Sequence, residues 1–185
     1  YGEWFNERLK RGYVTWKSPF DGRIFPVSFA NTRVFIFWSK NPRPFLSSLA
    51  DLIREGRQCL FLFTLNDYAK EDLEPGIPPL EERIMTFADL SHLIGRGRLT
   101  WRFDPLFLSD MVTIDDLLGR IGIIGDQIAG YTDRLVISFI DIARYPRVQR
   151  NLASSGLSGI REFSAEEMRL FASGLSQLNE DWGLE

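Results

Sequence analysis

The sequence contains one cysteine and one histidine, and this scarcity excludes several kinds of site. With Cys59 alone, the chain forms neither a disulfide framework nor a cysteine-rich metal or iron–sulfur centre. A chain without disulfides suits a reducing compartment, so we expect a cytoplasmic location. Cys59 opens an apolar run and is expected to be a core thiol. His92 falls near the C-terminal end of a helical pattern, where the helix dipole favours a histidine. With no second histidine, we expect no metal ligands in this chain.

Long hydrophobic runs and charge of one sign are also missing. The apolar stretches 34–38 and 59–63 are far shorter than the roughly 20 residues that cross a bilayer, and no signal-peptide pattern opens the sequence. The 22 basic and 25 acidic residues are mixed along the chain and give a net charge of −3. This distribution carries no strong nucleic-acid signature. We therefore expect no membrane partner, and a small-molecule or nucleotide-like substrate remains open.

Four apolar runs of strand length, each ending in polar residues, alternate with amphipathic helical patterns. Strands and helices that alternate in this way form a parallel sheet with right-handed crossovers, and nearly continuous apolar strands indicate a sheet covered on both faces. The pattern predicts an α/β fold, a partial (β/α) barrel of the TIM type, as a single domain over residues 1–185. The strand runs are 34–40, 59–66, 99–104 and 135–141, and the helical patterns are 45–55, 80–94, 114–129 and 165–179.

An open, doubly wound sheet is the alternative, because it shows the same alternation. Such a sheet usually has a glycine-rich phosphate loop after its first strand, and neither GxGxxG nor GxxxxGK[ST] occurs here. The helical pattern of Trp4, Phe5 and Leu9 starts at once, which suits a helix whose preceding strand lies before Tyr1. Gly183 closes the last helical pattern where another strand would follow. We therefore expect this chain to be an internal fragment of a longer protein.

Residues 13–29 are expected to form a β-hairpin inserted outside the barrel. Two β-type runs, 13–19 and 23–29, flank Asp21-Gly22. An Asp-Gly pair between such runs predicts a type I′ turn, because both central residues of that turn need positive φ. Further along, a short turn is expected around 147–152, and Ser164 with Glu167 predicts a capping box for the last helix.

Side chains alternate along a strand, so the four runs offer two faces. One face has branched residues where the strands begin and polar residues where they end, as the lumen of a barrel opening into a site would need. Ile36, Leu62, Arg102 and Ser138 are on this face. The other face is bulky and apolar and is expected to pack against helices. Its residues are Phe35, Phe37, Phe61, Phe63, Trp101, Phe103, Ile137 and Phe139.

The polar residues at the strand ends are the candidate site. Arg102 and Asp104 point the same way, so they can hold a polar substrate and tune each other's charge; an internal salt bridge is the alternative interpretation. Lys40 can bind an anionic group or, if buried, form a Schiff base, unless it is a solvated lysine in a proline-stiffened loop. We assign Arg102, Asp104 and Lys40 to catalysis. The residues assigned to substrate or cofactor binding are Asn41, Thr64, Asn66, Ser138 and Asp141, with Arg144 and Tyr145 extending the rim.

Beyond these patterns, the chain resembles the bacterial family known as domain of unknown function 1848. The resemblance covers essentially the whole chain and rests on several motifs in a fixed order. These are YGEWF at 1–5, RLKRGYV at 8–14, SPF at 18–20, VFIFWSKNPRP at 34–44, FTLNDY at 63–68, LEPGIPPLEERIMTF at 73–87, WRFDP at 101–105, GYTDR at 130–134 and SFID at 138–141.

The resemblance implies properties of a longer parent protein. Members of the family start with a short strand and continue into a cysteine-rich tail, whose C-x3-C-x2-C pattern is like the one with which radical S-adenosylmethionine enzymes hold a [4Fe–4S] cluster. It implies a radical S-adenosylmethionine-like or repair-lyase-like barrel enzyme, with the WSKNP, WRFDP and SFID strand ends lining its site. The cluster and S-adenosylmethionine are expected only in the full-length parent. This chain alone is expected to bind no cofactor and to be inactive.

Two functions from different classes remain open. The first is the barrel portion of a radical S-adenosylmethionine-like enzyme, in which the strand ends position the substrate or cofactor. The alternative is a non-catalytic binding module whose polar rim recognises a small anionic or nucleotide-like ligand.

Overall fold

The computed structural model describes residues 2–154 and 159–185 and has a four-stranded parallel sheet at its centre. Each strand pairs with the next one along the chain, so the sheet order is β3-β4-β5-β6. This confirms the four adjacent parallel strands predicted from the sequence. The described strands also lack the reversal of order that marks a doubly wound sheet. The strands are β3 (Val34–Ser39), β4 (Gln58–Thr64), β5 (Leu99–Leu106) and β6 (Arg134–Phe139).

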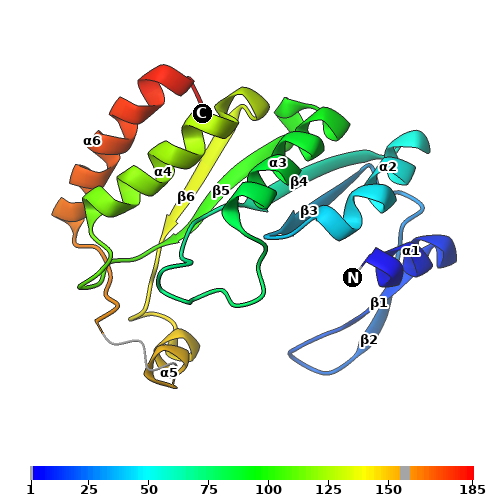
Figure 1. Cartoon of the computed structure of the whole chain (residues 1–185). Helices are drawn as coiled ribbons and strands as arrows, with labels where there is room; N and C mark the ends of the chain where they lie inside the picture. Colours follow the sequence, from blue (N-terminus) through cyan, green and yellow to red (C-terminus); the bar gives the residue numbers. More distant parts are fainter. Residues whose placement is uncertain (1, 155–158) are drawn as a thin grey trace.

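Four helices lie on one face of this sheet, and their bounds agree with the predicted helical patterns to within a few residues (Figure 1). They are α2 (Leu46–Arg54), α3 (Leu80–Ile94), α4 (Ile114–Ile128) and α6 (Ala165–Trp182). The capping box of Ser164 and Glu167 is present at the start of α6. None of the helices in the described ranges combines the length and the apolar character that a membrane crossing needs.

The segment before α6 differs from the prediction. The short turn expected around 147–152 is wrong, because Pro146–Ser154 form a helix, α5. Pro146 is the first residue of this helix, a position where its missing N–H would have no intrahelical partner and where its fixed φ suits the helix.

The predicted hairpin exists, but its turn is of another kind. Strands β1 (Tyr13–Lys17) and β2 (Ile24–Ser28) pair antiparallel and form a sheet of their own, next to helix α1 (Gly2–Arg11). Lys17 pairs with Ile24, so the connection is longer than two residues, and only Gly22 of the Asp-Gly pair has positive φ. The type I′ turn is therefore wrong. The Gly22 N–H donates to the Ser18 carbonyl oxygen at 3.0 Å, which closes a wider turn.

An aromatic layer between the sheet and the helices forms the core. Phe61, Phe63, Trp101 and Phe103 are at most 2% exposed, and the ring of Phe63 contacts Phe87 of α3 with centroids 5.4 Å apart. Because Trp101 Nε1 donates to the Leu65 carbonyl oxygen at 2.8 Å, its burial leaves no polar atom unpaired. The strand register predicted from the sequence is therefore confirmed.

The opposite face of the sheet, called here the open face, is not covered. It carries Ile36, Trp38, Leu62, Arg102 and Ser138, and Trp38 is 70% exposed. The prediction of a sheet covered on both faces is wrong for the described residues, because the three crossover helices α2, α3 and α4 and the following α6 all lie on the same side. An apolar open face is what sequence-ordered parallel strands leave when their crossovers all have one hand.

The sheet is open along β3 and β6, and the described strands do not close into a barrel. The backbone of Glu185 nevertheless pairs with the outer edge of β6. Its N–H donates to the Asp133 carbonyl oxygen at 2.9 Å, and its own carbonyl oxygen accepts from the Leu135 N–H at 3.0 Å. This is the pattern of a parallel ladder, so the edge of β6 accepts a neighbour in the same direction as the other strands.

The contact between α4 and α6 provides a test of the packing. A Cβ on Gly125 would lie 2.2 Å from the Trp182 ring, and that ring is held by a bond from Nε1 to Asp126 and by Trp101 on its other side. Gly125→Ala should therefore lower the free energy of unfolding by about 1–3 kcal/mol through overpacking. Gly119→Ala, in the same helix with open space around it, should instead raise it by about 0.5–1 kcal/mol. Urea denaturation of both variants measures the contrast, and two equal effects would contradict this packing.

Candidate functional site

The C-terminal ends of parallel strands meet at one edge of a sheet, and here that edge brings together a polar cluster. On the open face, the Arg102 guanidinium forms an ion pair with Asp104, and the Ser138 hydroxyl on the neighbouring strand donates to the other carboxylate oxygen of Asp104. The side chains of Arg102 and Asp104 are 25% and 20% exposed, so a ligand can still reach them. Three of the predicted site residues therefore form one connected group.

Asn66 joins this group from the end of β4. Its side-chain Nδ2 donates to the Asp104 carbonyl oxygen at 3.1 Å, and the residue is fully buried. Its Oδ1 is buried as well and has no hydrogen-bond partner. Thr64, which is 6% exposed, pairs with Arg102 in the register of β4 and β5. The structure thus places both residues beside the cluster, as the sequence predicted.

Lys40 follows β3, the edge strand of the sheet, and lies at the same C-terminal edge. Its ammonium group forms an ion pair with Glu74, which lies in the connection between β4 and α3. Burial lowers the pKa of the Lys40 ammonium; the nearby charge of Asp104 opposes this shift, and those of Arg83 and Arg102 add to it. The interaction with Asp104 and Arg102 links Lys40 to the polar cluster through space. The predicted alternative of a freely solvated lysine is wrong, because the amine is paired and partly buried.

The connection from Leu65 to Pro79 lies over this edge and is fixed by Arg120 of α4. The Arg120 guanidinium donates to both carboxylate oxygens of Glu71, at 2.6 and 2.8 Å, and also to the Asp67 carbonyl oxygen. Asp116 adds a second carboxylate at 2.6 Å. These bonds, that to Glu71 most of all, raise the pKa of Arg120, and the bond from Arg120 lowers the pKa of Glu71. The connection that supplies Glu74 is therefore held by a buried charge network.

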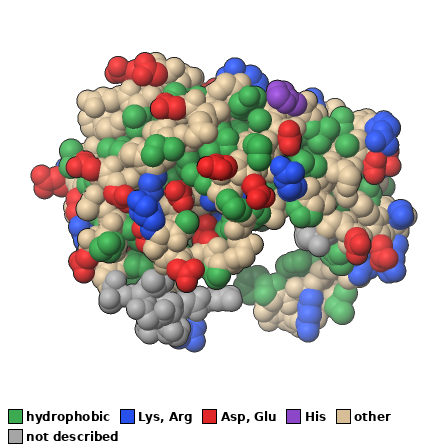
Figure 2. Space-filling model, in the orientation of Figure 1, with side chains coloured by type: hydrophobic (Ala, Val, Ile, Leu, Met, Phe, Trp, Pro, Cys, Tyr) green, Lys and Arg blue, Asp and Glu red, His purple; other side chains and the backbone are tan. Residues whose placement is uncertain are grey.

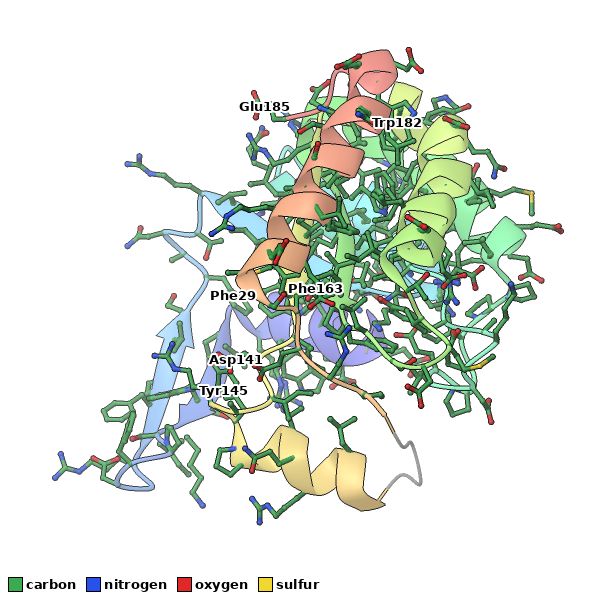
Figure 3. The ribbon with its side chains drawn as sticks, turned by 90° about the vertical axis from the view of Figure 1, so that its left-hand side faces the viewer. Phe29, Asp141, Tyr145, Phe163, Trp182 and Glu185 are labelled. Carbon is green, nitrogen blue, oxygen red and sulfur yellow. The ribbon has the colours of Figure 1, made fainter. Side chains whose placement is uncertain are left out.

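Four further predicted residues also follow the ends of β3 and β6, and their described contacts are with other parts of the chain than the polar cluster. Asn41 is exposed and borders a different pocket of about 280 Å³, whose apolar lining includes Phe37, Phe45 and Phe61 on the helix-covered side. Asp141 accepts a hydrogen bond from the Arg144 N–H at 3.0 Å and so stabilises its own turn. Arg144 and Tyr145 are exposed. In Figure 3, Asp141 and Tyr145 lie in the connection from β6 to α5, at the opposite end of the molecule from Trp182 and Glu185.

Sequence reasoning missed several residues that the fold brings to this edge. Glu74, Arg83 and Tyr68 come from the β4–α3 connection and from α3, not from strand ends, so the alternation of the strands could not identify them. Tyr68 is 2% exposed and donates to the Pro105 carbonyl oxygen at 2.6 Å, which ties the connection to β5. The NDY and LEP motifs contain Tyr68 and Glu74 and were the signal available. His92 and Cys59 are as expected, the first exposed at the end of α3 and the second 1% exposed in the core.

The space-filling view shows a hollow in the surface of the molecule. The molecule is hollowed between the hairpin region and the body formed by the sheet and its helices, and acidic and basic side chains are interspersed on the body above the hollow (Figure 2). The arrangement thus combines an open approach with charged groups of both signs, which suits a small polar ligand.

Comparison with known proteins identifies the family. The family model described as domain of unknown function (DUF1848) matches residues 1–185. The chain belongs to this family. No curated protein and no solved structure matches the chain. Membership in DUF1848 confirms the resemblance seen in the sequence motifs, and it assigns no activity.

The residues of this DUF1848 chain do not provide ligands for an iron–sulfur cluster. Cys59 is the one cysteine, and it lies near the start of β4, at the opposite end of the sheet from the polar cluster. In the parts of the chain that the structure describes, no three His, Cys, Asp or Glu side chains are grouped so that they could hold a metal ion. Any cluster in a parent protein would need thiolates from outside these residues.

Removing Arg120 should release the β4–α3 connection. Arg120→Ala leaves the partly buried Glu71 carboxylate without its partner, so the free energy of unfolding should fall by about 1.5–3 kcal/mol and amide exchange should accelerate across 65–79. Arg134→Ala breaks an exposed pair with Glu185 and should cost less than about 1 kcal/mol. Hydrogen exchange with mass spectrometry reads both effects. Unchanged exchange in 65–79 would show that other contacts hold the connection.

The buried Tyr68 predicts a dependence on alkaline pH. Burial raises the pKa of the Tyr68 hydroxyl above its ordinary 10.0 in the folded protein. A raised pKa means that the stabilisation is complete below pH 10 and is lost as the pH rises, since the unfolded state then loses the proton first. Tyr68→Phe should cost about 1 kcal/mol at pH 7 and should flatten the fall in stability above pH 10. Chemical denaturation from pH 7 to 11 measures this, and parallel curves would rule out Tyr68 as the source.

Proposed function

We propose that this chain is the substrate-binding part of a β/α-barrel enzyme, with its site at the C-terminal ends of the strands. The observation that carries the proposal is the convergence of Arg102, Asp104, Ser138 and Asn66 at that edge, from three neighbouring strands. Enzymes built on such barrels carry their catalytic residues at this end, where connections can vary without disturbing the core.

The barrel is supported by the strand order and by the edge of β6. A (β/α) barrel repeats a strand followed by a helix, with each strand beside the next one and all helices outside. The four parallel strands here have this order, and their helices lie on one side. The parallel pairing of Glu185 with β6 favours a further strand in the same direction at that edge. In a closed barrel, Ile36 and Leu62 on the open face would be covered by strands opposite, which accounts for apolar side chains there.

Each charged residue at this edge would have a different role toward the substrate. Arg102 would hold a carbonyl or anionic oxygen of the substrate, because its planar guanidinium keeps donors free beside Asp104. Asp104, oriented by Arg102 and Ser138, would accept a hydrogen bond or a proton from a substrate hydroxyl or amine. Lys40, whose pKa burial lowers, would donate a proton or stabilise negative charge on the other side of the site. These roles suit a small polar substrate.

Radical chemistry in the parent protein is the finer part of the proposal. It rests on the family resemblance, and an iron–sulfur cluster with S-adenosylmethionine would supply the radical there. The natural protein that contains this sequence should be purified anaerobically and assayed for iron, sulfide and cleavage of S-adenosylmethionine. Iron, sulfide and cleavage together support the proposal. A protein without iron that binds a small anionic ligand and turns nothing over would instead be the non-catalytic binding module.

Arg102→Ala tests the site in that protein. Loss of the guanidinium should reduce kcat/KM by about 100-fold or more, as for the loss of one preorganised donor. It should also lower the free energy of unfolding by about 1–3 kcal/mol, because Asp104 loses its charged partner. Arg23→Ala, on the exposed hairpin, should change neither quantity measurably. Normal turnover in Arg102→Ala would leave the pair as a structural salt bridge.

A further inference from the structure

Arg83 of α3 is a buried cation without a carboxylate partner among the described residues. The residue is 5% exposed, and no carboxylate oxygen in the described ranges lies within ion-pair distance of its guanidinium. Its Nε donates to the Pro78 carbonyl oxygen at 3.0 Å, while its Nη1 is buried and has no hydrogen-bond partner. An unpaired buried charge is costly to the folded state, so a fold that keeps one is expected to use it.

The position of Arg83 places its charge at the polar edge of the sheet. It lies one turn before Phe87, and Phe87 packs on Phe63 of β4 with ring centroids 5.4 Å apart. Since α3 runs antiparallel to the strands, the turn with Arg83 lies beyond Phe63, toward the C-terminal end of β4. Arg43, in the connection after β3, donates from Nε to Thr86 of α3 at 3.2 Å, which draws the Lys40 segment toward this turn.

Lys40 is a second cation near Arg83, at the same edge of the sheet. Burial lowers the pKa of Arg83 although Asp67 attracts its charge, and Arg83 in turn lowers that of Lys40, so the two cations are within electrostatic reach of each other. Pro79, which precedes α3, provides no side-chain cap, but the carboxylates of Glu81 and Glu82 lie in the first turn and compensate the positive end of the helix. Lys40 is already paired with Glu74. Arg83 is therefore the cation at this edge that has no carboxylate partner among the described residues.

We propose that Arg83, assisted by Lys40, binds a carboxylate group of the substrate between the ends of β3 and β4. This inference rests on the proposed function, since it gives the substrate of the same site an anionic end. A carboxylate fits because its single charge matches one unpaired guanidinium and its planar pair of oxygens matches the guanidinium fork. A phosphate dianion fits less well, because Lys40 and Arg102 are already paired with Glu74 and Asp104, which leaves the single charge of Arg83 to meet two negative charges.

Acetate and inorganic phosphate are the probes for this site. Binding is followed in the ¹⁵N-labelled chain through the Nε–H signal of Arg83 and the amide of Asn66, with sodium chloride keeping the ionic strength constant. Acetate should shift both signals in a saturable manner and should bind about tenfold more tightly than phosphate. Equal responses to acetate, phosphate and chloride would show general screening only and would overturn the proposal.

Variants of Arg83 separate a binding role from a structural one. Arg83→Met removes the unpaired charge, so the ligand-free protein should melt at the same temperature or higher, while stabilisation by acetate should disappear. Arg83→Lys should retain part of the acetate effect. Arg98→Gln, an exposed arginine beyond the other end of α3, should respond to acetate as the wild type does. A lower melting temperature of Arg83→Met, with acetate stabilisation intact, would make Arg83 structural and refute the proposal.

The experiment also distinguishes this inference from the proposed function. If Arg102→Ala loses turnover while Arg83→Met binds acetate as before, the carboxylate site is wrong and the proposed function stands. If Arg83 binds acetate and Arg102→Ala turns over normally, the enzymatic role of the cluster fails, and the carboxylate site remains as a property of a binding module.

Discussion

The structure depends on one packing constraint, the burial of an aromatic layer on a single face of a parallel sheet. Phe61, Phe63, Trp101 and Phe103 alternate with smaller or polar residues, and the helices cover only the aromatic side. Because side chains alternate strictly along a strand, this burial fixes which residues reach the open face. Arg102 and Ser138 are exposed to a ligand for the same reason that Phe103 and Trp101 are not.

The site depends on this constraint and on a second one, the buried network of Arg120. The sheet supplies Arg102, Asp104 and Ser138 with defined directions, while the connection between β4 and α3 supplies Glu74 and, at the start of the helix, Arg83. The bonds from Arg120 to Glu71 and Asp67 anchor that connection to α4, while Asn66 and Tyr68 anchor it to β5. A rigid strand edge facing a connection anchored by charge is an arrangement in which a polar ligand can be held from two sides.

Two buried polar atoms without hydrogen-bond partners support the proposed ligand site at this edge over a purely structural salt bridge. Arg102 and Asp104 could by themselves be an internal ion pair. The buried acceptor of Asn66 and the buried donor of Arg83 have no partner in the described residues, and structural networks usually satisfy such groups. Together they suggest that the ligand completes the hydrogen bonding. The proposed carboxylate site at Arg83 and the proposed role of Arg102 both depend on such a ligand, and each can be tested without the other.

The sequence alone determined the strands, their order, the register and the main helices, because alternation and helix punctuation are local signals. It also identified Arg102, Asp104, Ser138, Asn66, Thr64 and Lys40, which follow from strand ends meeting at one edge. It failed for the hairpin turn and for α5, where competing local signals decide the backbone. Only the tertiary structure revealed that one face is open and that Arg83 and Glu74 lie at this edge. Those residues belong to a helix and a connection whose positions depend on packing against distant parts of the chain, which no local pattern encodes.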